Sequence, residues 1–157
     1  MKVDKIIIHG EVFCGGSGYE NHIIQFSKAL NKIIPVQINC QRPVDFDRLE
    51  DKELKEMIQR NFDVEDSVNV MIGLPSYWEF LLSMNPMKFI GCVIWEATPF
   101  PKRWVNICND ERVNQLWTPS TFVKNIMIES GVDEKKIYVI PHGVNLSVFR
   151  AAEKIDE

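Results

Sequence analysis

Short apolar runs alternate with longer amphipathic stretches along most of the chain. Between the runs, apolar residues recur at helical spacing, as Ile23, Phe26 and Leu30 do in a helix predicted over 19–32. Strands that alternate with helices are typical of an open parallel sheet covered on both faces. We therefore predict an α/β fold, a Rossmann-like open parallel sheet of about six strands with helices on both faces. The predicted strands lie at 6–8, 35–39, 68–72, 89–95, 116–118 and 136–140.

The stretch 47–62 is strongly charged, yet its few apolar residues form one stripe. This pattern predicts a surface helix with one buried edge. Asp51 lies four residues before Lys55. Glu56 lies four residues before Arg60, and an acid at this distance ahead of a base can pair with it along the helix surface.

Two further helices carry start or stop signals. Ser76 with Glu79 fits a capping box at the start of a short helix. Ser120 is placed to cap another helix, and Gly131 suits the left-handed turn that ends it.

The composition and charge bear on the size of the fold and on the class of partner. A chain of 157 residues, 45% hydrophobic and 25% charged, fits one folded domain. Its net charge of −4 gives no general attraction to nucleic acid or to anionic lipid, so we expect no nucleic-acid partner. Peripheral membrane contact stays open.

The sequence also suggests a cellular setting. The first apolar run is too short for a signal peptide and no run is long enough to span a membrane, so we expect a cytoplasmic protein. Widely spaced cysteines that mostly lie in or beside apolar runs predict buried free thiols, and no metal-ligand spacing appears. The cysteines are Cys14, Cys40, Cys92 and Cys108.

A glycine-rich turn at 15–18 follows the first predicted strand and precedes a helix. This order presents backbone N–H groups at a positive helix end, which suits a phosphate or another oxygen-rich ligand. The match to the dinucleotide fingerprint is partial, because Asn21 holds the third glycine position and 39–40 lacks the acid that binds ribose. A tight turn that needs positive φ angles would also explain the glycines. The candidate binding residues are Gly15, Gly16, Ser17, Gly18 and Tyr19.

A second motif, 95–101, directly follows the most hydrophobic predicted strand. Ligands of open α/β sheets bind at the carboxyl ends of strands, so Glu96 can serve there as a base or hydrogen-bond acceptor. Pairing of Glu96 with Lys102 or Arg103 is the structural alternative. Trp95 can either pack in the core or stack on a ligand.

The third motif, 140–145, follows the last predicted strand. Gly143 lets the chain turn sharply, and His142 is expected to lie at the same sheet edge as the other two motifs. A lone histidine is more often structural than functional.

Together, and in this order, the three motifs resemble the amino-terminal domain of GT-B glycosyltransferases. The similarity is to the large retaining group, family 4, that is related to sucrose-phosphate and mannosyl transferases. It is carried by the glycine loop with Tyr19, by 115–124 continuing to Gly131, and by 136–145 followed by Phe149. The last of these stretches is the most specific.

The resemblance implies a division of the chain and a substrate class. Residues 1–146 would form the acceptor-side lobe, and 147–157 would begin a linker to an absent carboxyl-terminal domain that binds the donor. The donor would be a nucleotide-diphosphate sugar, with no other cofactor and no metal. The acceptor would be a glycan, a polysaccharide or a lipid-linked hydroxyl, and the anomeric configuration would be retained. The lobe alone is expected to be inactive.

One departure from the family matters. Many relatives carry a histidine followed by an acid after the fourth strand, whereas this chain has Trp95 and Glu96. A subgroup acting on cell-surface polysaccharides shares this pair, followed by a proline and a tryptophan that Pro101 and Trp104 match. We therefore predict Glu96 as the catalytic residue. The predicted substrate-binding residues are Gly15, Gly16, Ser17, Gly18, Tyr19, Trp95, Thr98, Ser120, His142 and Gly143.

Two other functions stay open on the sequence. One is a stand-alone Rossmann-type module that binds a nucleotide or metabolite without chemistry. The other is an inactive partner that supports another transferase.

Overall fold

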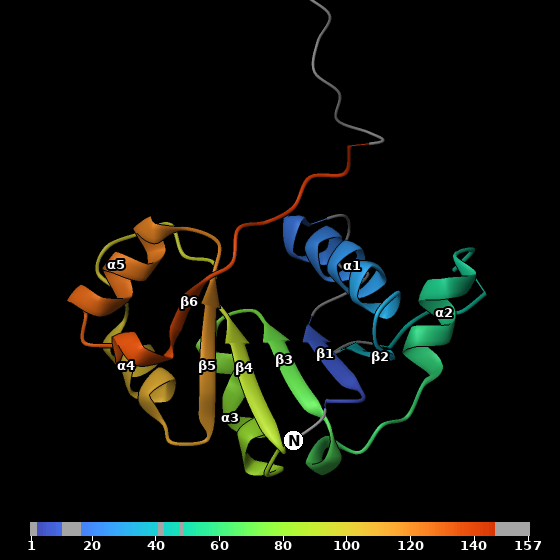
Figure 1. Cartoon of the computed structure of the whole chain (residues 1–157), viewed down its shortest axis with the longest axis horizontal. Helices are drawn as coiled ribbons and strands as arrows, with labels where there is room; N and C mark the ends of the chain where they lie inside the picture. Colours follow the sequence, from blue (N-terminus) through green and yellow to red (C-terminus); the bar gives the residue numbers. More distant parts are fainter. Residues whose placement is uncertain (1–2, 11–16, 41–42, 48, 147–157) are drawn as a thin grey trace, which may run out of the picture.

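The computed structural model describes residues 3–10, 17–40, 43–47 and 49–146. These residues form one parallel sheet with the strand order β2-β1-β3-β4-β5-β6 (Figure 1). The order and the parallel pairing confirm the predicted Rossmann-like fold. The strands are β1 (Ile6–Gly10), β2 (Val36–Cys40), β3 (Val68–Ile72), β4 (Lys88–Cys92), β5 (Val113–Thr118) and β6 (Ile137–Val139).

Helices cover both faces of the sheet, each over its own cluster of buried apolar side chains. One face packs against α1 (Gly18–Asn31) and α2 (Lys52–Gln59). The other packs against α3 (Trp78–Ser83), α4 (Lys102–Asn109) and α5 (Thr121–Glu129). Short 3-10 turns complete the described elements, at Val64–Asp66, Pro75–Tyr77 and Glu134–Lys136.

The boundaries of two central strands differ from the prediction. β4 ends at Cys92, three residues before the end of the predicted run 89–95. β5 begins at Val113, three residues before the predicted start at 116. The polar residues Asn114 and Gln115 belong to this strand, so the apolar pattern of the sequence did not reveal its first half. The side-chain oxygen of Asn114 accepts a hydrogen bond from the Phe89 amide at 2.7 Å, at a point where the pairing of β4 with β5 shifts register.

The charged stretch forms a shorter helix than predicted, and its charges contact other elements. Asp51 caps α2 by accepting from the Leu54 amide at 3.0 Å, and it also pairs with Lys28 of α1. Arg60 donates to the side chain of Asn31 at 2.5 Å and to the Val36 carbonyl at 2.6 Å. Tertiary contacts thus replace the predicted pairs along the helix.

The capping box predicted at Ser76 and Glu79 was wrong. Pro75 opens a 3-10 turn that includes Ser76, and α3 begins only at Trp78, without a side-chain cap. Proline favours the first position of a helical turn, so the turn begins earlier than the predicted cap. Glu79 instead accepts a hydrogen bond from Arg103 at 2.8 Å.

The helix signals at Ser120 and Gly131 were right. The Ser120 hydroxyl accepts from the Val123 amide at 3.3 Å, and Gly131 follows the helix with a φ of +103°. That angle lies in the region that favours glycine.

Ser120 therefore allows a direct test of its capping role. Replacing Ser120 by alanine should lower the free energy of unfolding by about 1 kcal/mol, because an α5 amide loses its acceptor. Ser120→Asp keeps an acceptor and should restore most of the stability. Urea denaturation measures both variants. Equal losses in the two would show that the hydroxyl does not act as a cap.

Candidate functional site

The first and third motifs follow β1 and β6 in the chain, and the second begins three residues after β4, so the described parts of all three lie near the carboxyl edge of the sheet. Gly15 and Gly16 lie outside the described residues. The Ser17 hydroxyl accepts from the Glu20 amide at 3.1 Å and so caps α1, and Gly18 is the first, exposed residue of that helix. The described part of the glycine motif is thus the start of α1. A helix start at this edge turns its first backbone N–H groups toward the place where ligands of such sheets bind.

Tyr19 connects the first motif to the second. Its hydroxyl donates to the Ile94 carbonyl at 3.1 Å, two residues before Glu96. Burial raises the pKa of Tyr19, and the charge of Glu96 raises it further. Tyr19 therefore stays protonated and holds the start of α1 beside the exposed carboxylate of Glu96.

Trp95 packs in an aromatic cluster. Its ring meets Trp104 edge to face at a centroid distance of 4.9 Å and Phe100 at 6.1 Å. The indole nitrogen is buried and has no hydrogen-bond partner among the described residues. The cluster anchors the loop that carries Glu96 to the body of the domain. The structure thus gives Trp95 a packing role, and its predicted contact with substrate stays a prediction.

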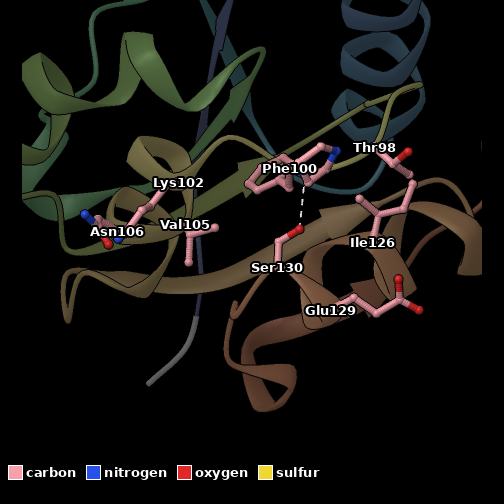
Figure 2. A pocket seen from close by; sticks show the side chains of 9 residues that line it. Thr98, Phe100, Lys102, Val105, Asn106, Ile126, Glu129 and Ser130 are labelled. Carbon is pink, nitrogen blue, oxygen red and sulfur yellow. Dashed lines mark hydrogen bonds between the residues drawn. The ribbon is translucent and has the colours of Figure 1, made fainter.

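Thr98 lines a groove of about 480 Å³ between α4 and α5 (Figure 2). The buried Phe100 also lines it, and its backbone N–H donates to the Ser130 hydroxyl at 3.0 Å. Lys102 and Glu129 lie toward opposite ends. Glu96 is not among the residues that line this groove, and the predicted contact of Thr98 with substrate stays a prediction.

His142 stacks on a residue that the sequence did not single out. Its ring lies over the ring of His22 in α1, with centroids 4.0 Å apart and an interplanar angle of 26°. His22 in turn stacks on Phe26, one helical turn later, at 5.6 Å. The segment after β6 therefore crosses the carboxyl edge and runs beside α1 (Figure 1). The four-residue spacing of His22 and Phe26 was visible in the sequence, but nothing local linked it to His142.

A larger groove, of about 1070 Å³, is lined by His22, Phe26 and His142. We call it the α1 groove. One wall is a face of α1 from Gly18 to Lys32, and the other is formed by residues 142–146, with Glu53 of α2 also contributing. The α1 groove brings together Gly18, His142 and Gly143, three of the predicted binding residues.

The histidines here are neutral at pH 7. Burial, and then the neighbouring His142, lower the pKa of His22 from 6.5 to about 4. Burial also lowers the pKa of His142. Neutral rings can stack without charge repulsion, which explains how two histidines lie in contact.

A pH titration tests this stack. In the unfolded chain His22 has its ordinary pKa of 6.5, so it takes up a proton below that pH. In the folded chain it takes up the proton only near pH 4. Stability should therefore fall as the pH drops from 6.5 towards 4, and stay constant above 6.5 as far as this group is concerned. NMR titration of the imidazole protons should place His22 near 4, and His142→Ala should raise that value. A midpoint near 6.5 in the unchanged chain would rule out the stack.

His9 occupies a second polar network that the sequence did not reveal. Its Nε2 hydrogen-bonds to the Asn69 side-chain oxygen at 2.9 Å, and the Asn39 amide donates to its Nδ1 at 3.2 Å. Burial lowers the pKa of His9 to about 4. The network joins β1 to β2 and β3, and Asn39 holds the position at which a ribose-binding acid would stand in a dinucleotide-binding domain.

The described cysteines fit the expectation in part. Cys92 and Cys108 are buried free thiols, and burial raises the pKa of each to about 12. Cys40 is only half-buried, and Cys14 lies outside the described residues. In the described ranges no group of histidine, cysteine and acidic side chains is arranged to hold a metal ion. In those same ranges, no helix combines the length and the apolar character that crossing a bilayer requires.

Comparison with known proteins supports the fold. No protein-family model matches the chain, and no curated protein matches it by sequence. Among solved structures, HepE from Anabaena, crystallised in complex with UDP and glucose, is similar with a TM-score of 0.58 and 14% identity. The match covers 95% of this chain and 47% of HepE, so the chain spans about half the length of that protein. At this identity the likeness establishes the fold alone.

Proposed function

We propose that this domain is the acceptor-side lobe of a retaining glycosyltransferase of the GT-B type. The complete enzyme would move a sugar from a nucleotide-diphosphate sugar to a hydroxyl of a glycan, a polysaccharide or a lipid-linked acceptor. Residues 1–146 would form this lobe, and 147–157 would lead to a domain that binds the donor.

The observation that carries the proposal is the similarity to HepE over 95% of the chain. HepE was crystallised with UDP and glucose, which are the two parts of one nucleotide-diphosphate sugar. The described parts of the three motifs lie near the carboxyl edge of the sheet, where open α/β sheets bind their ligands. The described contacts of Tyr19 and His142 join two of these motifs to α1.

Glu96 is the proposed catalytic residue. Its side chain is exposed at this edge, and Tyr19 lies close enough for the charge of Glu96 to raise the pKa of Tyr19. It would accept a hydrogen bond from the acceptor hydroxyl and so orient that oxygen for attack. Trp95 and Tyr19 would fix the loop and the helix on either side of it.

The other predicted residues have supporting roles in the proposal. The glycine loop and the start of α1 would face the donor diphosphate, because a helix N-terminus stabilises negative charge. His142 and Gly143 would line the acceptor side through the α1 groove. Thr98 would contact an acceptor from the groove between α4 and α5, and Ser120 from the start of α5.

Calorimetry separates this proposal from a stand-alone nucleotide-binding module. The 157-residue chain should bind UDP weakly or not at all, because the donor-binding domain supplies most of the contacts. The complete gene product should bind a nucleotide-diphosphate sugar tightly. Tight binding of UDP by the chain alone would favour the module and contradict the proposal.

A further inference from the structure

The α1 groove has the shape of a site for an extended ligand. Its α1 wall runs from Gly18 to Lys32. At 1.5 Å per residue this wall is about 21 Å long. That length accommodates several linked sugar units and exceeds what a single monosaccharide can fill.

A stack of aromatic rings ends in this groove. Trp117 of β5 meets Phe26 edge to face at 6.2 Å, Phe26 stacks on His22, and His22 stacks on His142. His142 is exposed and lines the groove. The stack behind it fixes the ring in place, so the ring forms a preorganised flat surface. Such a surface suits the C–H face of a pyranose ring.

The polar groups beside this ring are neutral and available. Asn21 and Gln25 are exposed, lie about one turn apart on α1 and line the groove. In the part of the chain that the structure describes, no hydrogen bond engages either side chain. Each amide offers both donors and an acceptor, which is the combination that binds sugar hydroxyls.

The charges in the groove disfavour a polyanion. Lys28 pairs with Asp51, and Glu53 accepts a hydrogen bond from Asn31 at 3.2 Å. Lys32 at the far end is exposed. Among the described lining residues, Lys32 is therefore the one cation that no ion pair engages, and the net charge of the chain is −4.

We infer that the α1 groove binds an extended, neutral oligosaccharide, with one pyranose ring on His142 and hydroxyls on Asn21 and Gln25. The binding itself follows from the ring stack, the amides and the length of the groove. The further step, that this oligosaccharide is the acceptor that receives the transferred sugar, rests on the proposed function. It would make the acceptor a glycan chain several sugars long.

The test uses the 157-residue chain, labelled with ¹⁵N, and a panel of neutral probes. Maltohexaose, cellohexaose and mannohexaose would be titrated in turn, beside their disaccharides. At least one hexasaccharide should shift the amide signals of α1 and of residues 142–146, and bind more tightly than its disaccharide. If no hexasaccharide moves these signals, the inference is wrong. The same holds if UDP or an acidic hexasaccharide moves them and the neutral ones do not.

Variants identify the residues that bind. His142→Ala should weaken binding about tenfold, because a ring contact is lost, whereas His142→Phe keeps the flat surface and should retain most of the affinity. Asn21→Ala combined with Gln25→Ala should weaken binding by about tenfold through two lost hydrogen bonds. Asn125→Ala and Gln59→Ala, at exposed helical positions outside the groove, are the matched controls. Equal effects in variants and controls would overturn the inference.

The two proposals fail in different ways. If an oligosaccharide binds in the groove but the complete protein transfers no sugar, the proposed function is wrong and the oligosaccharide site stands. If the complete protein transfers sugar to an acceptor that does not shift the amide signals of α1, the oligosaccharide site is wrong and the proposed function stands.

Discussion

Alanine in place of Gly91 should destabilise the domain by about 2 kcal/mol, the usual cost of overpacking a closed core. A Cβ atom at Gly91 would lie 2.1 Å from the nearest ring carbon of Trp78. Trp78 is fully buried against Phe89, at a centroid distance of 5.4 Å, and has no room to withdraw. The free energy of unfolding in urea, followed by circular dichroism, measures the effect.

Two further variants isolate this contact. Gly18→Ala is the matched control, because a Cβ there meets nothing within 4 Å, and it should change stability little. Trp78→Leu should itself be destabilising, but in its background the cost of Gly91→Ala should shrink, since the clashing ring is gone. If Gly91→Ala costs no more than Gly18→Ala, or costs the same with and without Trp78, α3 does not pack on β4 as described.

The second large effect concerns catalysis. In the complete enzyme that we propose, Glu96→Gln should lower the rate of sugar transfer by about a hundredfold, the order of loss expected when a positioned base is removed. The side chain is exposed, so the amide should be tolerated without loss of stability. The turnover number should fall, while the affinity for the donor should stay close to that of the unchanged enzyme.

The control for this variant is another exposed glutamate. Glu65→Gln lies in the 3-10 turn ahead of β3, at the amino edge of the sheet, and should leave transfer unchanged. Steady-state kinetics with a fixed acceptor and a varied donor would compare the two. Similar rates of transfer for Glu96→Gln and Glu65→Gln would show that Glu96 takes no part in the reaction.

The alternation of apolar and amphipathic segments was enough to predict the fold. β3 was placed at 68–72 without error, and the cap at Ser120 was right, because both depend on signals within a few residues. The errors arose where a distant partner decides the structure. Asp51 pairs with Lys28 of another helix instead of the base four residues along.

The candidate site was predicted in outline only. The sequence could place three motifs at one edge, because parallel strands end together. It could not reveal that Tyr19 bonds to Ile94 or that His142 stacks on His22, since these pairs are far apart in the chain. For the same reason the sequence did not indicate the groove between α4 and α5 that Thr98 lines.

The most direct test of the proposed function is an assay of the complete gene product with a panel of nucleotide-diphosphate sugars. We expect one of these donors to lose its sugar with release of a nucleoside diphosphate, and NMR of the product to show a retained anomeric configuration. The 157-residue chain alone should release none. A complete protein that neither transfers nor hydrolyses the sugar of any donor in the panel would contradict the assignment of this domain to a glycosyltransferase.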